Sequence, residues 1–197
     1  PIIIYTDASF EPESGLPPRI GWVIFGLSEV KGVTMQLPWS LVNQWIPRVQ
    51  QIFPAEAFAP LMAVIHHGAE LKGRDIYVFI DNEAAASAVI RGATRADDVD
   101  LIVQALHWKL HLLSARFWVE WIDSKSNPSD GLSREGLLDA WTLEQGWDLE
   151  EAPPGLIEES NSFKSEMELT LGSGLKILAY ASHGYTAYVS YCCQPRG

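Results

Sequence analysis

Four acidic residues occupy positions from which their carboxylates can reach one point. Asp7 and Asp81 each follow a short apolar run, IIIY in one case and DIYVFI in the other, that is typical of a buried strand. Glu56 falls in the expected first turn of a helix that begins at Pro54, and Asp130 opens another helix. Taken singly, each acid has an ordinary structural explanation as a turn residue, a helix cap or a surface acid. Together they predict a site, because neighbouring strands of a mixed sheet would carry Asp7 and Asp81 to the same end.

A cluster made only of carboxylates indicates a particular chemistry. Four converging acids would repel one another and raise one another's pKa values, so the cluster is stable mainly around divalent cations. Oxygen ligands select Mg2+ or Mn2+ over zinc. Two such ions about 3.5–4 Å apart can hold the attacking water and the leaving oxygen of a phosphoryl transfer. We therefore expect two Mg2+, or Mn2+ in their place, and no covalent intermediate.

The elements that must position these acids follow from the periodicity of apolar residues. The expected strands span residues 2–5, 20–27, 33–42, 75–80 and 116–122. The expected helices span residues 54–72, 84–90, 97–115 and 130–147. This β-β-β-α-β-α-α-β-α order predicts an α/β fold, a mixed sheet with helices on its faces.

Length and charge divide the chain. Its 197 residues, 47% hydrophobic and 20% charged, suit one well-cored domain with a modest appendage. We expect a catalytic domain over residues 1–147, an acidic linker with prolines over 148–161 and a C-terminal extension of unknown role over 162–197. The net charge of −11 lies mostly in the tail, because residues 1–134 carry 15 acids and 11 lysines or arginines. Our hypothesis is that the acidic tail mimics nucleic acid and competes with it.

The ends of the chain and its cysteines add little chemistry. No apolar run approaches the roughly 20 residues that span a bilayer, and the amino end has no signal pattern, so we expect a cytoplasmic or nuclear protein without a membrane partner. The first residue is Pro1 rather than Met, so we expect that the chain is cut from a longer polypeptide or otherwise processed. Cys192 and Cys193 are adjacent and have no zinc-site spacing.

The sequence around all four acids resembles the ribonuclease H family. The motifs are YTDAS around Asp7, PAEAFAPLMAV around Glu56, FIDNEAAASAVIRG around Asp81 and NPSDGLSR around Asp130. The match spans residues 2–134, and DNEAA and SNPSDGLSR look most like the ribonuclease H domains of reverse-transcribing mobile elements. The resemblance implies a ribonuclease H-like fold whose five-stranded sheet has the order 3-2-1-4-5. It also implies endonucleolytic cleavage of the RNA strand of an RNA/DNA hybrid, with an adjacent reverse transcriptase domain as a partner.

The same resemblance assigns roles to residues. It makes Asp7 the ligand that bridges both metals, places Glu56 and Asp81 mainly on the leaving-group side, and places Asp130 on the water-activating side. Six further residues are expected substrate contacts by position: Ala8, Ser9, Asn82, Arg91, Lys125 and Arg134. The loop before the fourth acid reads SKSN, without the histidine of many members, and no basic protrusion is evident. We therefore expect slow turnover and weak substrate binding in isolation.

Other proteins on related folds remain alternatives. One is a catalytically inactive, structural ribonuclease H-like domain of a reverse transcriptase, which typically loses its acids. Another is a DNA integrase or transposase, whose last acid is usually a glutamate on the final helix, unlike Asp130. A proofreading exonuclease would carry Asp-x-Glu on the first strand, whereas this chain has Asp7-Ala8-Ser9.

Overall fold

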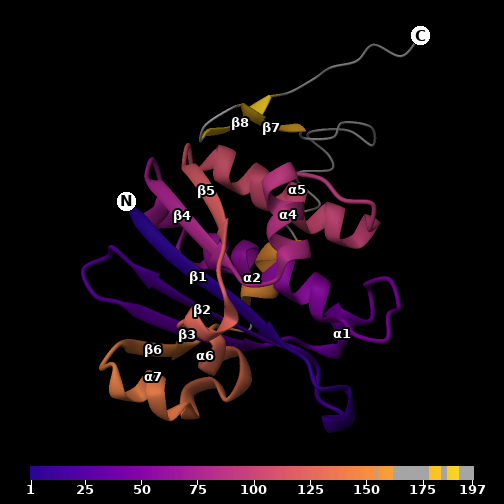
Figure 1. The fold of residues 1–197 in the computed structure, drawn as a ribbon, viewed down its shortest axis with the longest axis vertical. Helices are drawn as coiled ribbons and strands as arrows, with labels where there is room; N and C mark the ends of the chain where they lie inside the picture. Colours follow the sequence, from indigo (N-terminus) through magenta and orange to yellow (C-terminus); the bar gives the residue numbers. More distant parts are fainter. Residues whose placement is uncertain (154, 162–177, 183–185, 191–197) are drawn as a thin grey trace.

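The protein is built on a six-stranded mixed sheet in the order β5-β4-β1-β2-β3-β6 (Figure 1). The computed structural model describes residues 1–153, 155–161, 178–182 and 186–190. The strands are β1 (Ile2–Ser9), β2 (Arg19–Phe25), β3 (Lys31–Gln36), β4 (Asp75–Ile80), β5 (Arg116–Trp121) and β6 (Asp148–Glu151). β1, β2 and β3 pair antiparallel, whereas β4 and β5 extend the sheet in parallel from β1. The predicted α/β class and the order 3-2-1-4-5 are confirmed, but the count of five strands is wrong because β6 adds to the edge of β3.

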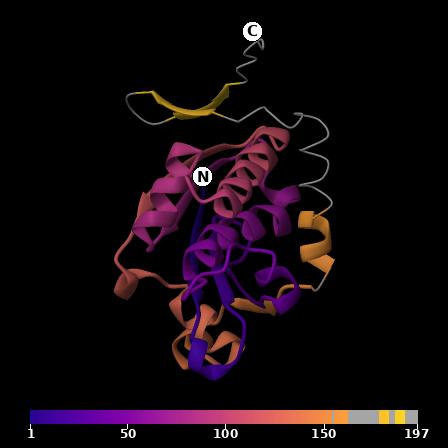
Figure 2. The same cartoon turned by 90° about the vertical axis from the view of Figure 1, so that its right-hand side faces the viewer.

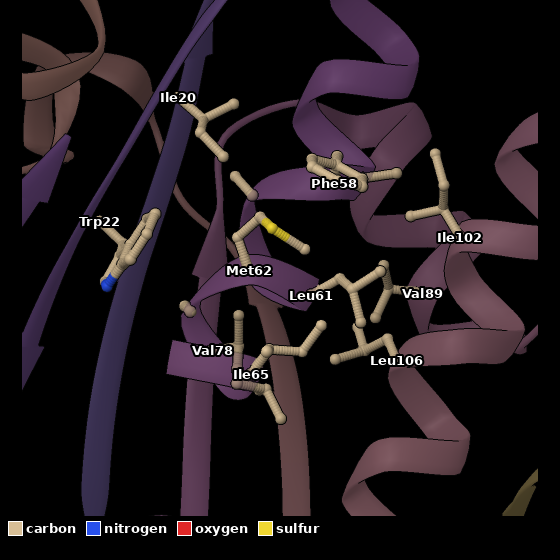
Figure 3. Close-up of a cluster of buried hydrophobic side chains, with 14 of the residues drawn as sticks. Ile20, Trp22, Phe58, Leu61, Met62, Ile65, Val78, Val89, Ile102 and Leu106 are labelled. Carbon is tan, nitrogen blue, oxygen red and sulfur yellow. The ribbon is translucent and has the colours of Figure 1, made fainter. Parts of the chain in front are cut away.

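Helices cover one face of the sheet and enclose the core (Figures 1 and 2). They are α2 (Ile52–His66), α3 (Gly68–Leu71), α4 (Glu83–Arg91) and α5 (Asp97–Leu112). α2 packs against β1 and β2 and is itself covered by α4 and α5. Figure 3 shows Leu61 and Met62 of α2 between Trp22 of the sheet and Leu106 of α5. Because α2 is buried from Pro54 to Ile65, it is apolar all round, and its single acid has to be explained.

The opposite face of the sheet carries short helices that follow β5. They are η2 (Ser124–Ser126), α6 (Asp130–Arg134), η3 (Gly136–Leu138) and α7 (Ala140–Glu144). Adjacent residues of a strand point to opposite faces, and on β2 Trp22 contacts the α2 layer while Gly21 contacts α6. The single helix expected over residues 130–147 is wrong. Gly136, with φ of 65°, takes the left-handed conformation that glycine adopts readily and breaks the helix.

Other boundaries shift where proline acts. β3 ends at Gln36 rather than at residue 42, because Pro38 cannot donate to a ladder and instead precedes a short helix, α1 (Trp39–Val42). The helix expected over residues 54–72 begins at Ile52, two residues earlier, and ends at His66, followed by α3. Pro54 is thus its third residue, still within the first turn that tolerates proline.

Part of the expected linker over residues 148–161 is folded onto the domain. Asp148–Glu151 form β6, parallel to β3, and residues 155–161 are helical. Ala152, Leu156 and Ile157 are buried in the core. Acids and prolines dominate this stretch, and they obscured the few apolar residues that attach it to the sheet. The division into domain, linker and extension stays a prediction.

Most of the expected extension over residues 162–197 lies outside the described residues. Within it, β7 (Leu178–Ser182) and β8 (Thr186–Ser190) pair antiparallel as a separate two-stranded sheet. In the part of the chain that the structure describes, no helix has both the length and the apolarity to cross a membrane.

Candidate metal centre

Asp7 and Asp81 lie together because their strands are parallel neighbours. The ladder between β1 and β4 ends with Thr6 opposite Ile80, so the two aspartates are the next residues on each side. The sequence predicted that Asp7 lies at the end of its strand. This position is wrong, because β1 continues to Ser9 by pairing with β2. The backbone at Asp7 is therefore still paired with β2, on the side of β1 that faces away from β4.

Asp81 is not needed as a helix cap. The N-cap of α4 is Asn82, whose Oδ1 accepts a hydrogen bond from the backbone N–H of Ala85 at 3.0 Å. Trp121, at the end of β5, donates from Nε1 to the backbone carbonyl of Asp81 at 2.8 Å. The backbone around Asp81 is thus fixed on both sides, and its carboxylate is left to the site.

Glu56 reaches the same place from the helical layer. It is the fifth residue of α2, beyond the first turn in which the sequence placed it, and it is 3% exposed. Its Oε1 accepts a hydrogen bond from the backbone N–H of Ala8 at 3.3 Å. Its Oε2 is buried and has no hydrogen-bond partner among the described residues. A buried, unpaired carboxylate oxygen is costly unless a cation binds it.

The three carboxylates form one group. Ligand oxygens from Asp7, Glu56 and Asp81 all lie within 4.8 Å of one another. Burial, together with the nearby charge of Asp81, raises the pKa of Asp7 from 3.8 to about 7. Burial, and then the charges of Asp7 and Asp81, raise the pKa of Glu56 well above its usual value. The residues fit a divalent cation, because a cation would balance this charge and occupy the unpaired oxygen, and oxygen ligands suit Mg2+ or Mn2+.

The helix that carries the fourth acid is fastened to the sheet by side chains. Asn127 donates from Nδ2 to the carbonyl of Thr6 at 3.0 Å, directly before Asp7. Thr34 of β3 donates from Oγ1 to the carbonyl of Leu132 at 2.7 Å. These bonds hold α6 and its preceding loop across β1, β2 and β3.

Glycine on the sheet lets α6 come this close. A Cβ atom on Gly21 would lie 2.8 Å from the Cβ of Leu132 and 2.8 Å from the backbone nitrogen of Ser133, distances that real Cβ atoms do not tolerate. Gly21 is also the partner of Asp7 in the ladder. The absence of a side chain at Gly21 therefore lets the helix lie close to the part of the sheet that carries Asp7.

Asp130 stands at the rim of the group rather than within it. It is not one of the three acids whose oxygens converge, and its Oδ1 accepts a hydrogen bond from Nε of Arg134 at 2.8 Å. Its side chain is 36% exposed. Its charge nevertheless contributes to the raised pKa of Asp7.

The expected substrate contacts fall into two groups. Lys125 and Arg134 line an open hollow of about 370 Å³ beside Asp130, which the half-exposed Trp141 also lines. The remaining expected contacts, Ala8, Ser9, Asn82 and Arg91, do not line this hollow. The Ala8 N–H binds Glu56, and the Ser9 hydroxyl donates to the carbonyl of Ser133 at 2.5 Å.

Asn82 and Arg91 stay predictions as substrate contacts, and the structure shows only where they lie. Asn82 uses its side-chain oxygen to cap α4. Arg91 lies in the last turn of the nine-residue α4, about 12 Å along the helix from the residue that follows Asn82. Lys125 and Arg134 are therefore the expected cationic contacts that line the hollow beside Asp130.

Sequence reasoning missed Gly21 and Ser133. Ser133 is fully buried, and its hydroxyl donates a hydrogen bond to Oδ2 of Asp7. A signal for Ser133 was present, because it lies three residues after Asp130 and thus on the same face of the predicted helix. No local signal marked Gly21, since its role depends on contact with a helix more than 100 residues away in the sequence.

Comparisons with known proteins give structural neighbours only. No family model and no curated protein matches the chain. Among solved structures, it is similar to RNase H1 from the halophilic archaeon Halobacterium salinarum NRC-1, with 21% identity, a TM-score of 0.47, and coverage of 71% of this chain and 98% of that chain. It is also similar to the N-terminal RNase H domain of rv2228c from Mycobacterium tuberculosis, with 16% identity, a TM-score of 0.47, and coverage of 74% and 97%. We base the functional proposal on the residues of the site.

Proposed function

We propose that this chain is a ribonuclease H, which hydrolyses the RNA strand of RNA/DNA hybrids endonucleolytically with two divalent metal ions. The observation that carries the proposal is the convergence of Asp7, Glu56 and Asp81 within 4.8 Å at one end of the sheet. The sequence motifs around these acids and around Asp130 resemble those of the ribonuclease H family, and the observed strand order is the one that this resemblance implies.

The family resemblance supports a division of roles among the four acids. Asp7 would serve as a ligand of both ions, with Glu56 and Asp81 mainly on the leaving-group side. Asp130, partly exposed at the rim, would lie on the water-activating side. Bound Mg2+ or Mn2+ would supply positive charge for the attacking water and the leaving oxygen. Glu56 and the backbone around Asp81 are held by hydrogen bonds, which keeps their carboxylates in place for this task.

Substrate binding is assigned to the side of the site on which Asp130 lies. Lys125 and Arg134 offer positive charge to backbone phosphates beside the acids. RNA would be distinguished from DNA through its 2′-hydroxyls in the wide minor groove. Because Lys125 and Arg134 alone supply little positive charge, we expect the isolated chain to bind the hybrid weakly. We therefore further propose an adjacent reverse transcriptase domain of a reverse-transcribing element as its partner.

The proposal is tested by cleavage of a labelled RNA/DNA hybrid with Mg2+, beside duplex RNA and duplex DNA. We expect cleavage of the hybrid alone, lost in Asp81→Asn. The matched control is Asp75→Asn, at the opposite end of β4, where the aspartate only pairs with Arg116 on the surface.

Two outcomes would contradict the proposal. Cleavage and joining of duplex DNA would favour an integrase or transposase. Absence of cleavage, even with Mn2+ and a reverse transcriptase added, would favour a structural domain without activity.

A further inference from the structure

Ser133 lies where α6 meets the strand that carries Asp7. Its side chain is completely buried, and its Oγ donates a hydrogen bond to Oδ2 of Asp7. Its backbone is held as well, because the Ser9 hydroxyl donates to the Ser133 carbonyl at 2.5 Å. The hydroxyl is therefore fixed in place against the carboxylate rather than free to rotate toward solvent.

The hydroxyl has two acceptors within reach and only one hydrogen. Besides Asp7, the carbonyl of Asp130 lies 2.9 Å from the Oγ of Ser133. An ionised carboxylate is the stronger acceptor, so the hydrogen points to Asp7 whenever Asp7 is charged. A carboxylate oxygen has two lone pairs, and this bond uses one of those on Oδ2. Asp7 keeps its remaining lone pairs for cations.

One turn of helix thus carries two functions. Asp130 and Ser133 are three residues apart and share a face of α6. Leu132, between them, is completely buried and packs over Gly21, and this contact sets the distance between the helix and β2. α6 therefore places Asp130 at the rim of the site and the hydroxyl of Ser133 against Asp7.

We propose that Ser133 is a positioning residue of the metal centre. Its hydrogen bond fixes the rotation of the Asp7 carboxylate and thereby sets the affinity of the site for divalent cations. This inference rests on the proposed function only in taking Asp7 as a metal ligand. Partners that orient a metal ligand typically change metal affinity or activity about 10- to 100-fold when they are removed.

The test compares two variants that each remove one hydrogen bond of α6. Ser133→Ala removes the bond to Asp7. Thr34→Val removes the bond to the Leu132 carbonyl, which fastens the same helix to β3 without touching any acid. Mn2+ binding is measured by titration calorimetry, and hybrid cleavage is measured against Mg2+ concentration.

We expect about 10- to 100-fold weaker Mn2+ binding and a correspondingly higher Mg2+ requirement in Ser133→Ala. Thr34→Val should bind Mn2+ as the unmodified chain does while melting at a lower temperature. Wild-type metal affinity in Ser133→Ala would overturn the inference. Equal weakening in Thr34→Val would also overturn it, because docking of the helix, rather than the hydroxyl, would then set the affinity.

Ser133→Cys covers the case in which Ser133→Ala does not fold. The thiol is a weak donor, so Mn2+ affinity should fall between those of serine and alanine, and unchanged affinity would contradict the inference. Calorimetry does not depend on cleavage. If the unmodified chain binds Mn2+ but cuts no hybrid, the proposed function fails while the role of Ser133 is still measured.

Discussion

The two sides of the site are built by different means. Asp7 and Asp81 are placed by a parallel backbone ladder that ends one residue before each of them. Asp130 is placed by a five-residue helix whose position depends on side-chain hydrogen bonds and on close packing over Gly21. A backbone ladder tolerates most side chains, whereas the docking of α6 requires particular ones. The strand side should therefore fail mainly when an acid is changed, and the helix side also when the close packing of α6 over Gly21 is changed.

The largest effect is expected from Asp7→Asn on the strand side. Hybrid cleavage should fall about 100- to 1000-fold or more, because a charged ligand at the centre of the group is lost. The metal-free protein should nevertheless melt at a higher temperature near pH 7, because a buried charge has been removed. Cleavage rates and thermal melts in EDTA measure the two effects. A lower melting temperature in EDTA would show that the Asp7 charge is not a burden on the fold.

The pH dependence of stability should show the same destabilisation of the metal-free protein by the buried Asp7 charge. The pKa of Asp7 is 3.8 unfolded and about 7 folded, so between these values the folded chain holds an extra proton. The free energy of unfolding of the metal-free protein should therefore decrease as pH rises from about 4 to about 7, by up to about 4 kcal/mol from this group.

A buried histidine opposes this trend. Burial lowers the pKa of His67 to about 4, so its contribution to stability increases with pH between about 4 and 6.5. Denaturant titrations of the unmodified chain and of Asp7→Asn, from pH 4 to 7.5 in EDTA, cancel the effect of His67. If the difference in free energy of unfolding between the two chains does not change with pH, the pKa of Asp7 is not raised by folding.

On the helix side, Gly21→Ala should be the most damaging change that touches no acid. The added methyl group must displace Leu132 and Ser133, at a cost of about 1–3 kcal/mol in stability. The shift of α6 should reduce cleavage about 100-fold. Gly68→Ala is the matched control, because its Cβ would lie 3.7 Å from its nearest neighbours. Full activity in Gly21→Ala would mean that the position of α6 does not matter.

The smallest effect is expected from Arg134→Ala. Its ion pair with Asp130 is exposed, so the loss in stability should be within about 1 kcal/mol. The KM for the hybrid should rise a few-fold, with kcat nearly unchanged, because a positive charge that we assign to the backbone phosphates of the hybrid is lost. Arg116→Ala, which breaks a similar exposed pair with Asp75 away from the site, should leave KM unchanged. An unchanged KM in Arg134→Ala would remove this arginine from the binding surface.

Local patterns predicted the strand side well. The runs IIIY and DIYVFI carry their own strand signal, and the order 3-2-1-4-5 implied by the family resemblance is confirmed. The helix side was predicted poorly. The single helix over residues 130–147 is broken at Gly136, and no propensity showed which of its residues would contact β1 and β2. β6 was taken for linker, because its acids outnumber the apolar residues that attach it.

The sequence by itself predicted the chemistry that we propose for this chain, because acids in strand and helix contexts, with the motifs around them, favour a divalent-cation centre for phosphodiester cleavage. Only the tertiary structure decided which of the acids come together in one group and which lies at its edge. It placed Asp7, Glu56 and Asp81 within one group, left Asp130 at the rim, and set Ser133 against Asp7. The reason is physical: strand and helix signals depend on neighbours in the chain, whereas burial, charge repulsion and a shared hydrogen bond depend on residues far apart in the sequence, such as Ala8 and Glu56.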